Sequence, residues 1–130
     1  MAVVKQLSVF LANKPGALAR LYHSFARAKV NLIAITVSDT VDHAVVRMVV
    51  DDPERAEALL EQHGVLVVDN DVLAIRLTNK PGALAQLAEK LANAKVNIEY
   101  AYGTAGTGKN SSLLILRVNN LAKARKVLKA

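Results

Sequence analysis

The spacing of apolar side chains changes period at regular points along the chain. In residues 7–11, leucine and valine occupy every second position, which predicts a β-strand with one buried face. Residues 18–25 then place apolar side chains at i, i+3, i+4 and i+7, the spacing of an amphipathic helix. The chain therefore opens with a strand that is followed by a helix.

Two further strands and a second helix follow in the same way. Residues 30–37 are rich in β-branched side chains, and residues 44–50 again alternate, so both predict strands joined by a polar turn. Asp51–Pro53 is typical of a helix start, and Gly64 ends that helix before a short closing strand at 65–68. The order is βαββαβ, which is the ferredoxin-like arrangement of an α+β fold with an antiparallel sheet.

The same pattern occurs twice. Segment 13–19 returns unchanged as 79–85, and between residues 13 and 31 the two copies match at 13 of 19 positions without a gap. Such identity predicts a duplicated module of roughly 66 residues. We expect one module over residues 1–70 and a second, C-terminally incomplete one over residues 71–130.

The second module differs from the first at two places. Its central hairpin is two residues longer, and the chain ends before the closing strand of the first module has a counterpart. The strand at 73–78 would then lack a neighbour, and proteins usually cover an apolar open edge. Either the chain is truncated, or another chain or module covers this edge.

Composition narrows the possible chemistry. Of the 130 residues 52% are hydrophobic, which excludes a disordered chain, and the absence of cysteine excludes disulfides, thiolate nucleophiles and iron–sulfur clusters. No apolar run reaches the roughly 20 residues of a membrane helix. We therefore expect a soluble, cytoplasmic protein with an aliphatic core.

The net charge of +6 lies entirely in residues 66–130, which makes nucleic-acid binding an alternative to consider. Ferredoxin-like RNA-binding domains stack bases on aromatic residues of the first and third strands, where this chain has only Phe10. The C-terminal basic cluster is better explained as one exposed face of the last helix, so nucleic acid is not the expected partner. Its members are Lys123, Arg125, Lys126 and Lys129.

Other chemical motifs are incomplete. Residues 103–110 nearly match a phosphate-binding loop, but Asn110 replaces the metal-binding hydroxyl, and residues 113–116 predict a strand where that loop requires a helix. The segment is better explained as a hairpin, which can also close over a neighbouring site. His23, His43 and His63 lack ligand spacing, so we expect no metal, no cofactor and no catalytic residue.

The repeated motifs carry a resemblance. An Asn-x-Pro-Gly-x-Leu turn before the first helix and a Val-Asn-[Ile/Leu] start of the second strand occur in both copies, at 13–18 with 30–32 and at 79–84 with 96–98. In this order of elements the chain resembles a tandem pair of ACT domains. The resemblance implies a non-catalytic regulatory module that binds an amino acid at interfaces between paired modules.

The residues suit such a ligand physically. The first N–H groups of a helix lack intrahelical partners and attract a carboxylate, a glycine in the turn allows close approach, and an asparagine amide both donates and accepts. The start of the second strand lies about a helix length away, so it can contribute only to the loop of another, antiparallel module. The two expected composite sites are Asn13, Gly16, Ala17 and Leu18 with Asn97 and Ile98, and Asn79, Gly82, Ala83 and Leu84 with Asn31 and Leu32.

The resemblance also sharpens the expected ligand. Related serine-binding ACT domains carry a histidine two residues before the loop asparagine, where this chain has Leu11 and Leu77, which favours an apolar ligand side chain. Glu99, which replaces Ile33 of the first copy, is either a partner for an α-ammonium group or a solvated strand residue.

Two partner classes follow from this resemblance. The first is a second copy of the chain, in a homodimer or higher homo-oligomer. The second is an amino-acid biosynthetic enzyme such as acetolactate synthase, although its small subunit carries the loop motif once whereas this chain carries it twice.

Overall fold

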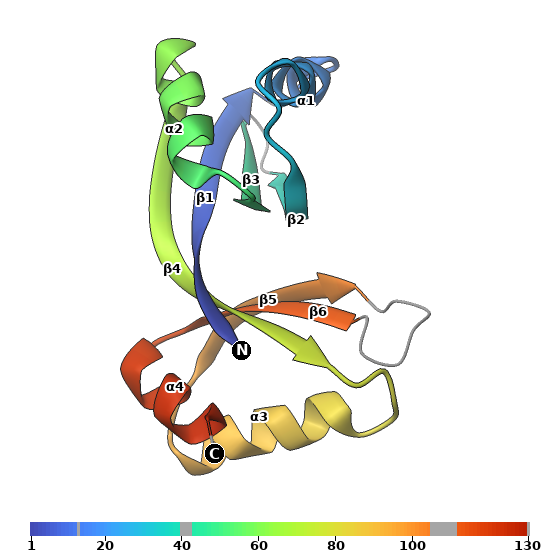
Figure 1. Ribbon diagram of the computed structural model, residues 1–130, viewed down its shortest axis with the longest axis vertical. Helices are drawn as coiled ribbons and strands as arrows, with labels where there is room; N and C mark the ends of the chain where they lie inside the picture. The colour runs from blue at the N-terminus through green and yellow to red at the C-terminus, as the bar shows by residue number, and fades with distance from the viewer. Residues whose placement is uncertain (13, 40–42, 105–111, 130) are drawn as a thin grey trace. The chain divides into compact units, whose positions relative to one another are not determined.

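The computed structural model describes residues 1–12, 14–39, 43–104 and 112–129. Within them, the strands are β1 (Ala2–Ala12), β2 (Leu32–Asp39), β3 (His43–Val50), β4 (Leu66–Leu77), β5 (Ile98–Thr104) and β6 (Ser112–Val118). The helices are α1 (Ala17–Arg27), α2 (Pro53–Gln62), α3 (Ala83–Asn93) and α4 (Leu121–Leu128) (Figure 1).

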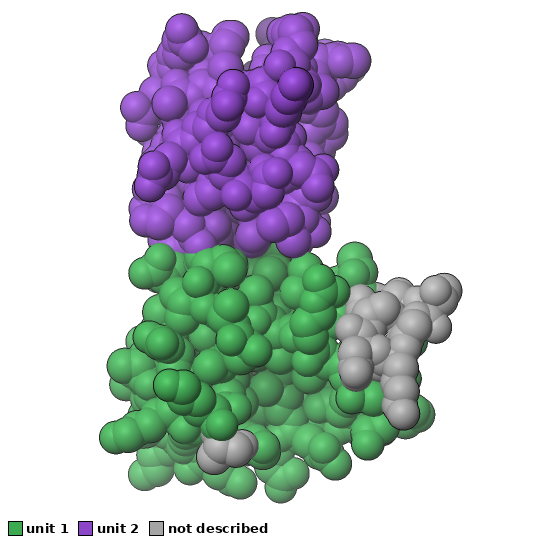
Figure 2. Space-filling view, viewed as in Figure 1, with its two compact units in different colours: residues 1–4, 71–130 green, residues 5–70 purple. Residues whose placement is uncertain are grey.

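The chain divides into two compact units (Figure 2). The N-terminal unit is Lys5–Asn70, and the C-terminal unit combines Met1–Val4 with Asp71–Ala130. The strand order is β2-β3-β1-β4-β6-β5, and β1 pairs antiparallel with β3, β3 with β2, β4 with β6 and β6 with β5. The expected α+β fold of two ferredoxin-like modules is confirmed.

The core of the N-terminal unit follows the predicted periods. Leu7 and Val9 on β1 are fully buried, while the apolar stripe of α1 buries Leu21 and Phe25. From α2, Leu60 and the small Ala56 join the same cluster. One face of the sheet and one face of each helix therefore form the core.

The C-terminal unit repeats this core position by position. Leu73 and Ile75 on β4 replace the two β1 residues, Leu87 and Leu91 replace those of α1, and Ala124 on α4 replaces the alanine of α2. Because the two cores share this pattern, the duplication seen in the sequence is a duplication of packing.

The edge of the C-terminal unit is occupied by the chain's own first residues. Met1–Val4 group with Asp71–Ala130, β1 is the neighbour of β4 in the strand order, and Val3 packs against the cluster that contains Leu73. In the N-terminal unit the corresponding packing comes from Val65 and Val67. Val3 thus takes the place of a closing-strand valine.

β4 is one strand where the pattern predicts two. The strands expected at 65–68 and 73–77 join through Asp69–Asp71, which contains neither glycine nor proline. Within this run, the Asn70 side-chain oxygen accepts a hydrogen bond of 3.3 Å from Nε2 of the fully buried Gln6. The polar run is therefore part of the strand rather than a turn.

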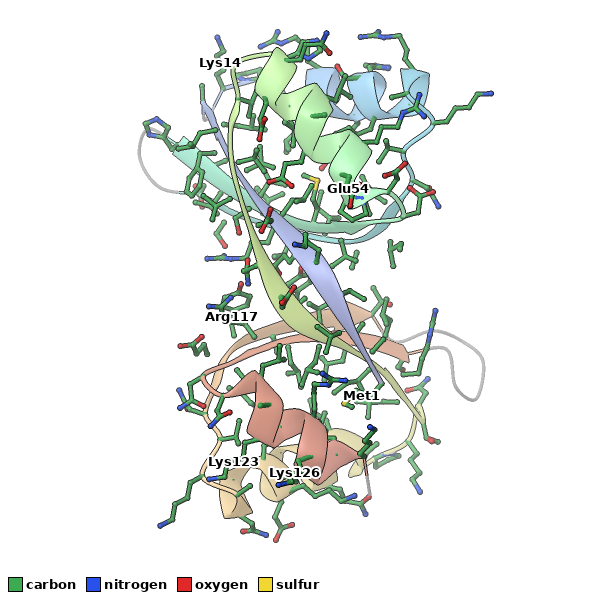
Figure 3. The ribbon with its side chains drawn as sticks, turned by 60° about the vertical axis from the view of Figure 1, so that its left-hand side comes forward. Met1, Lys14, Glu54, Arg117, Lys123 and Lys126 are labelled. Atoms are coloured by element: carbon green, nitrogen blue, oxygen red, sulfur yellow. The ribbon has the colours of Figure 1, made fainter. Side chains whose placement is uncertain are left out.

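The second hairpin confirms the rejection of a phosphate loop. β6 begins at Ser112, so a strand stands where that loop requires a helix. Residues 105–111, which include most of the motif, lie outside the described residues. The basic side chains of α4, among them Lys123 and Lys126 (Figure 3), are exposed as expected.

Replacing Val3 with aspartate tests the edge role of the N-terminal residues. A carboxylate against the core of the C-terminal unit should lower its free energy of unfolding by about 1–3 kcal/mol. Hydrogen exchange of the amides of β6 and α4 measures this loss. The matched control is Val68→Asp on the exposed part of β4, where Val68 keeps 52% of its surface; equal protection in both variants would contradict the edge role.

Stability of the N-terminal unit should depend on the protonation of Glu57. A hydrogen bond to Asp69, burial and the charges of Asp69 and Glu61 raise the pKa of Glu57 above 4.5, and Lys5 opposes this. Near this pKa the folded unit binds more protons than the unfolded chain. Protonated Glu57 therefore stabilises the folded unit below pH 4.5, and this stabilisation is lost as pH rises through the raised pKa. Glu57→Gln should unfold at a higher temperature at pH 7, by at most about 4 °C.

Thermal denaturation followed by circular dichroism from pH 3.5 to 8 measures this difference. The advantage of Glu57→Gln should shrink towards the acid end. Glu54→Gln in the first turn of α2 is the control, since it removes a charge that favours the helix start. A pH-independent gain in Glu57→Gln would contradict the assignment.

Candidate functional site

The two copies of the Asn-Lys-Pro-Gly turn have the same backbone geometry. Gly16 has φ 87° and ψ −13°, and Gly82 has φ 88° and ψ −14°. This left-handed conformation is easy for glycine and strained for other residues. Each glycine is the last residue before a helix, α1 or α3.

The helix starts differ in how their first N–H groups are satisfied. The side chain of Asp52 accepts from the Arg55 N–H at 3.2 Å and caps α2, and Asn120 accepts from the Lys123 N–H at 3.1 Å and caps α4. α1 and α3 have no side-chain cap. The first N–H of α1 and of α3, from Ala17 and Ala83, donates to the carbonyl of Lys14 or Lys80 at 3.4 Å, so the second and third N–H groups are the first-turn donors for water or a ligand.

A pocket of about 460 Å³ opens at the start of α3 in the C-terminal unit. Asn79, Ala83 and Leu84 line it from the turn and helix, and 101–104 and 112–114 line it from the β5–β6 hairpin. In Figure 1 the end of β4, the start of α3 and the end of β5 lie at the same end of this unit. Three of the predicted site residues thus share one pocket with Lys80, and Gly82 lies in the turn between them.

The hairpin side of this pocket was only partly anticipated. The sequence suggested that the hairpin can close over a neighbouring site; in the structure Tyr102, Thr104 and Ser112 line the pocket. Gly103 allows the strands to approach closely, because a Cβ there would lie 2.5 Å from the Leu113 carbonyl oxygen. The greater length of the second hairpin was the sequence feature that could have indicated its contribution to the pocket.

The polar groups of the pocket favour an anion. Lys80 lines it, and among the described residues no aspartate or glutamate does. Glu99, considered as a partner for an ammonium group, does not line this pocket and pairs with Arg117 on β6, with its Oε1 3.1 Å from the arginine Nε. Uncharged oxygen atoms, including that of the Asn79 amide, are the acceptors on this surface.

The predicted strand-start residues lie at the other end of the first helix of each unit. The Asn31 N–H donates to Asp51 Oδ1 at 2.9 Å while the Asp51 N–H donates to the Asn31 carbonyl at 3.0 Å. Asn97 makes the same two bonds with Asn119, at 2.9 and 3.1 Å. Asn31 and Asn97 make these bonds with backbone atoms only. The start of the second strand in each unit therefore does not depend on the side-chain amides of Asn31 and Asn97.

Each unit alone therefore separates the two halves of the expected sites. α1 has 11 residues, a length of about 16 Å. Gly16, Ala17 and Leu18 lie at its start, Asn31 and Leu32 follow its end, and Asn97 and Ile98 likewise follow α3. Asn13 lies outside the described residues.

Two further features concern metals and membranes. In the described part of the chain, no group of three or more histidine, aspartate or glutamate side chains is placed to hold a metal ion. None of the described helices has the length and apolar character needed to cross a bilayer.

Comparison with known proteins gives a family. A family model described as an ACT domain pair matches residues 1–130. A search of curated proteins finds no match.

Solved structures share this architecture. A Bacteroides thetaiotaomicron protein is 35% identical, with a TM-score of 0.92 over 98% of this chain and 87% of that one. The regulatory subunit of aspartate kinase from Thermus thermophilus is 16% identical, with a TM-score of 0.69 over 99% of this chain and 96% of that one. Its counterpart from Thermus flavus is also 16% identical, with a TM-score of 0.63 and coverage of 98% and 94%. The likeness to the two kinase subunits concerns the fold.

Replacing Gly82 with alanine should destabilise the turn without a steric clash. No atom lies within 4 Å of an added Cβ, so the cost arises from the positive φ and should be about 1–2 kcal/mol of unfolding free energy. Gly64→Ala is the matched control, since Gly64 has φ 71°, equally open surroundings and no part in the pocket. Chemical denaturation measures both variants; an unchanged midpoint in Gly82→Ala would contradict a strained turn.

Proposed function

Because the chain belongs to the ACT domain family as a pair of ACT domains, we propose that it is a non-catalytic cytoplasmic regulator that binds an amino acid between paired modules. The pocket at the start of α3 is the observation that carries this proposal. It combines a helix start without a side-chain cap, one lysine and an asparagine amide on a partly apolar surface.

The surfaces of this pocket suit the two ends of an amino acid. The carboxylate lies at the first-turn N–H groups of α3, where the helix dipole and Lys80 favour negative charge. The ammonium group lies against uncharged oxygens such as that of Asn79. Leu77, Leu84 and Leu113 provide an apolar wall, so an apolar ligand side chain is preferred.

A second module completes each site. Asn31 and Leu32 of one module reach the ligand held at Asn79, Gly82, Ala83 and Leu84. Asn97 and Ile98 likewise reach the ligand held at Asn13, Gly16, Ala17 and Leu18. This arrangement requires antiparallel pairing of modules in a homodimer or higher homo-oligomer. Ligand binding then stabilises the paired state, and that change of population is the signal.

A partner enzyme is a second candidate readout. The Thermus thermophilus chain is a regulatory subunit of aspartate kinase, and it has this fold over nearly the same extent. By analogy, the ligand-bound pair would inhibit or activate an amino-acid biosynthetic enzyme. Co-purification with and without the ligand separates this readout from a free-standing sensor.

Thermal denaturation with each of the twenty amino acids tests the proposal. An amino acid with an apolar side chain at 100 times its dissociation constant should stabilise the protein by about 2.7 kcal/mol. Asn31→Ala and Asn97→Ala should each keep the unliganded melting temperature, because the strand-entry bonds use backbone atoms of these residues. Together they should remove the ligand-induced shift.

Asn119→Ala is the structural control, since it removes the acceptor of the Asn97 N–H but no proposed ligand contact. It should lower the melting temperature and keep the ligand-induced shift. A full shift in the Asn31→Ala/Asn97→Ala double variant would contradict the composite sites. Absence of a shift with all twenty amino acids would overturn amino-acid sensing.

A further inference from the structure

The N-terminal unit contains a cavity with mainly apolar walls. It measures about 290 Å³ and lies between α1 and α2 at the end of β1. Its walls are mainly apolar, with Leu11 from β1, Leu21 and Phe25 from α1, and Leu59 and Leu60 from α2. Of the described residues that are expected to bind an amino acid, only Ala17 lines it. The cavity is separate from the pocket at α3, and it meets the proposed amino-acid site of the N-terminal unit at Ala17.

The polar residues that line this cavity are basic or neutral: Lys14, Arg20, Ser24 and His63. Lys14 contributes from the turn, where Figure 3 shows it near the end of α2 that is opposite Glu54. Arg20 also lines the cavity; its Nη1 lies 3.6 Å from the position of a Cβ on Gly16, so the guanidinium reaches back to the same turn. The two cations can therefore meet one anionic group.

His63 and Ser24 add hydrogen-bonding groups. The Nδ1 atom of His63 lies 2.8 Å from the Leu59 carbonyl oxygen, and a carbonyl only accepts, so Nδ1 carries the proton. In this tautomer Nε2 only accepts, so it does not donate to a carboxylate. Ser24 lines the cavity from α1 with a hydroxyl that donates or accepts.

Charge and polarity together select the ligand. Lys14 and Arg20 both line the cavity and no described aspartate or glutamate does, so a ligand meets two cations there, whereas the pocket at α3 has one lysine. The apolar walls disfavour a small, fully hydrated anion, because desolvating a charge is costly unless it is paired. We propose that this cavity binds a monocarboxylic acid with an apolar tail, the carboxylate at Lys14 and Arg20 and the tail against Phe25 and Leu60.

The corresponding place in the C-terminal unit differs where the proposal requires it. A pocket of about 380 Å³ lies there, lined by Lys80, Leu87 and Leu128 at the equivalent positions. Gln86 replaces Arg20, Lys90 replaces Ser24, and Arg76 is a further cation in this pocket. Leu91, the counterpart of Phe25, does not line it, so the wall proposed for the apolar tail is missing there. We therefore expect one such site per chain.

Calorimetric titration of the full chain with butanoate, hexanoate and octanoate tests this proposal. The affinity should rise about fourfold per added CH₂ group, with one site per chain. Arg20→Gln, which introduces the residue of the second module, should weaken octanoate binding at least tenfold. Arg27→Gln is the matched control on the same helix; Arg27 is exposed, does not line the cavity and should leave the affinity unchanged.

Further measurements keep the test decisive if Arg20→Gln is unstable. Ser24→Leu should fill the cavity and abolish octanoate binding, and octylamine should not bind. Equal binding of octylamine, unchanged binding by Arg20→Gln, or full displacement of octanoate by inorganic phosphate would overturn the proposal. The Asn31→Ala/Asn97→Ala double variant should bind octanoate normally, so failure of the amino-acid sites and failure of this site are distinguishable.

Discussion

Backbone pairing along β4 is the constraint on which both units depend. β4 (Leu66–Leu77) has β1 and β6 as neighbours; its first residues belong to the N-terminal unit and its last to the C-terminal unit. β1 is also shared between the units, but here the first residues belong to the C-terminal unit, which contains Met1–Val4, and the rest belong to the N-terminal unit. The start of β1 lies beside β4 in the C-terminal unit, where an unpaired apolar edge would be unfavourable. β4 contributes to the core of the C-terminal unit and also ends at the turn before α3. The core of this unit and the pocket at the start of α3 therefore share one backbone segment.

Much of the fold could be predicted, because periodicity reports which face of an element is buried. Because the module is repeated, the apolar spacing of its elements occurs twice in the sequence. The βαββαβ order and the core residues of both copies, such as Phe25 and Leu91, could therefore be predicted from spacing. Strand pairing over long separation leaves no local signal, which is why the edge role of Val3 was not found. The pocket was half predicted for a similar reason. Asn79 and Leu84 lie in a recognisable turn, whereas Tyr102 and Thr104 reach it from a hairpin distant in sequence.

The two modules have diverged where packing does not constrain them. Core positions exchange one aliphatic or aromatic residue for another, because a packed interior tolerates small changes of volume. Around the cavities the exchanges alter chemistry instead: Arg20 and Ser24 become Gln86 and Lys90, and Val37 becomes Gly103. The surplus positive charge follows the same rule, since the basic residues of α4 are exposed and face no core. Duplication therefore produced one scaffold with two unlike surfaces.

The contrast among the four helix starts links stability to binding. Glycine is the N-cap residue of α1 and α3, whereas the side chains of Asp52 and Asn120 cap α2 and α4. Relative to Asp or Asn, a glycine N-cap lowers helix stability by only about a few tenths of a kcal/mol. The glycine cap occurs at the turn that is identical in both copies, so it belongs to the turn itself. An acceptor that occupies the helix start makes the hydrogen bonds that a cap would make. Ligand binding at this position and the stability of the first helical turn are then thermodynamically coupled, because a ligand that binds the folded turn shifts the equilibrium towards it.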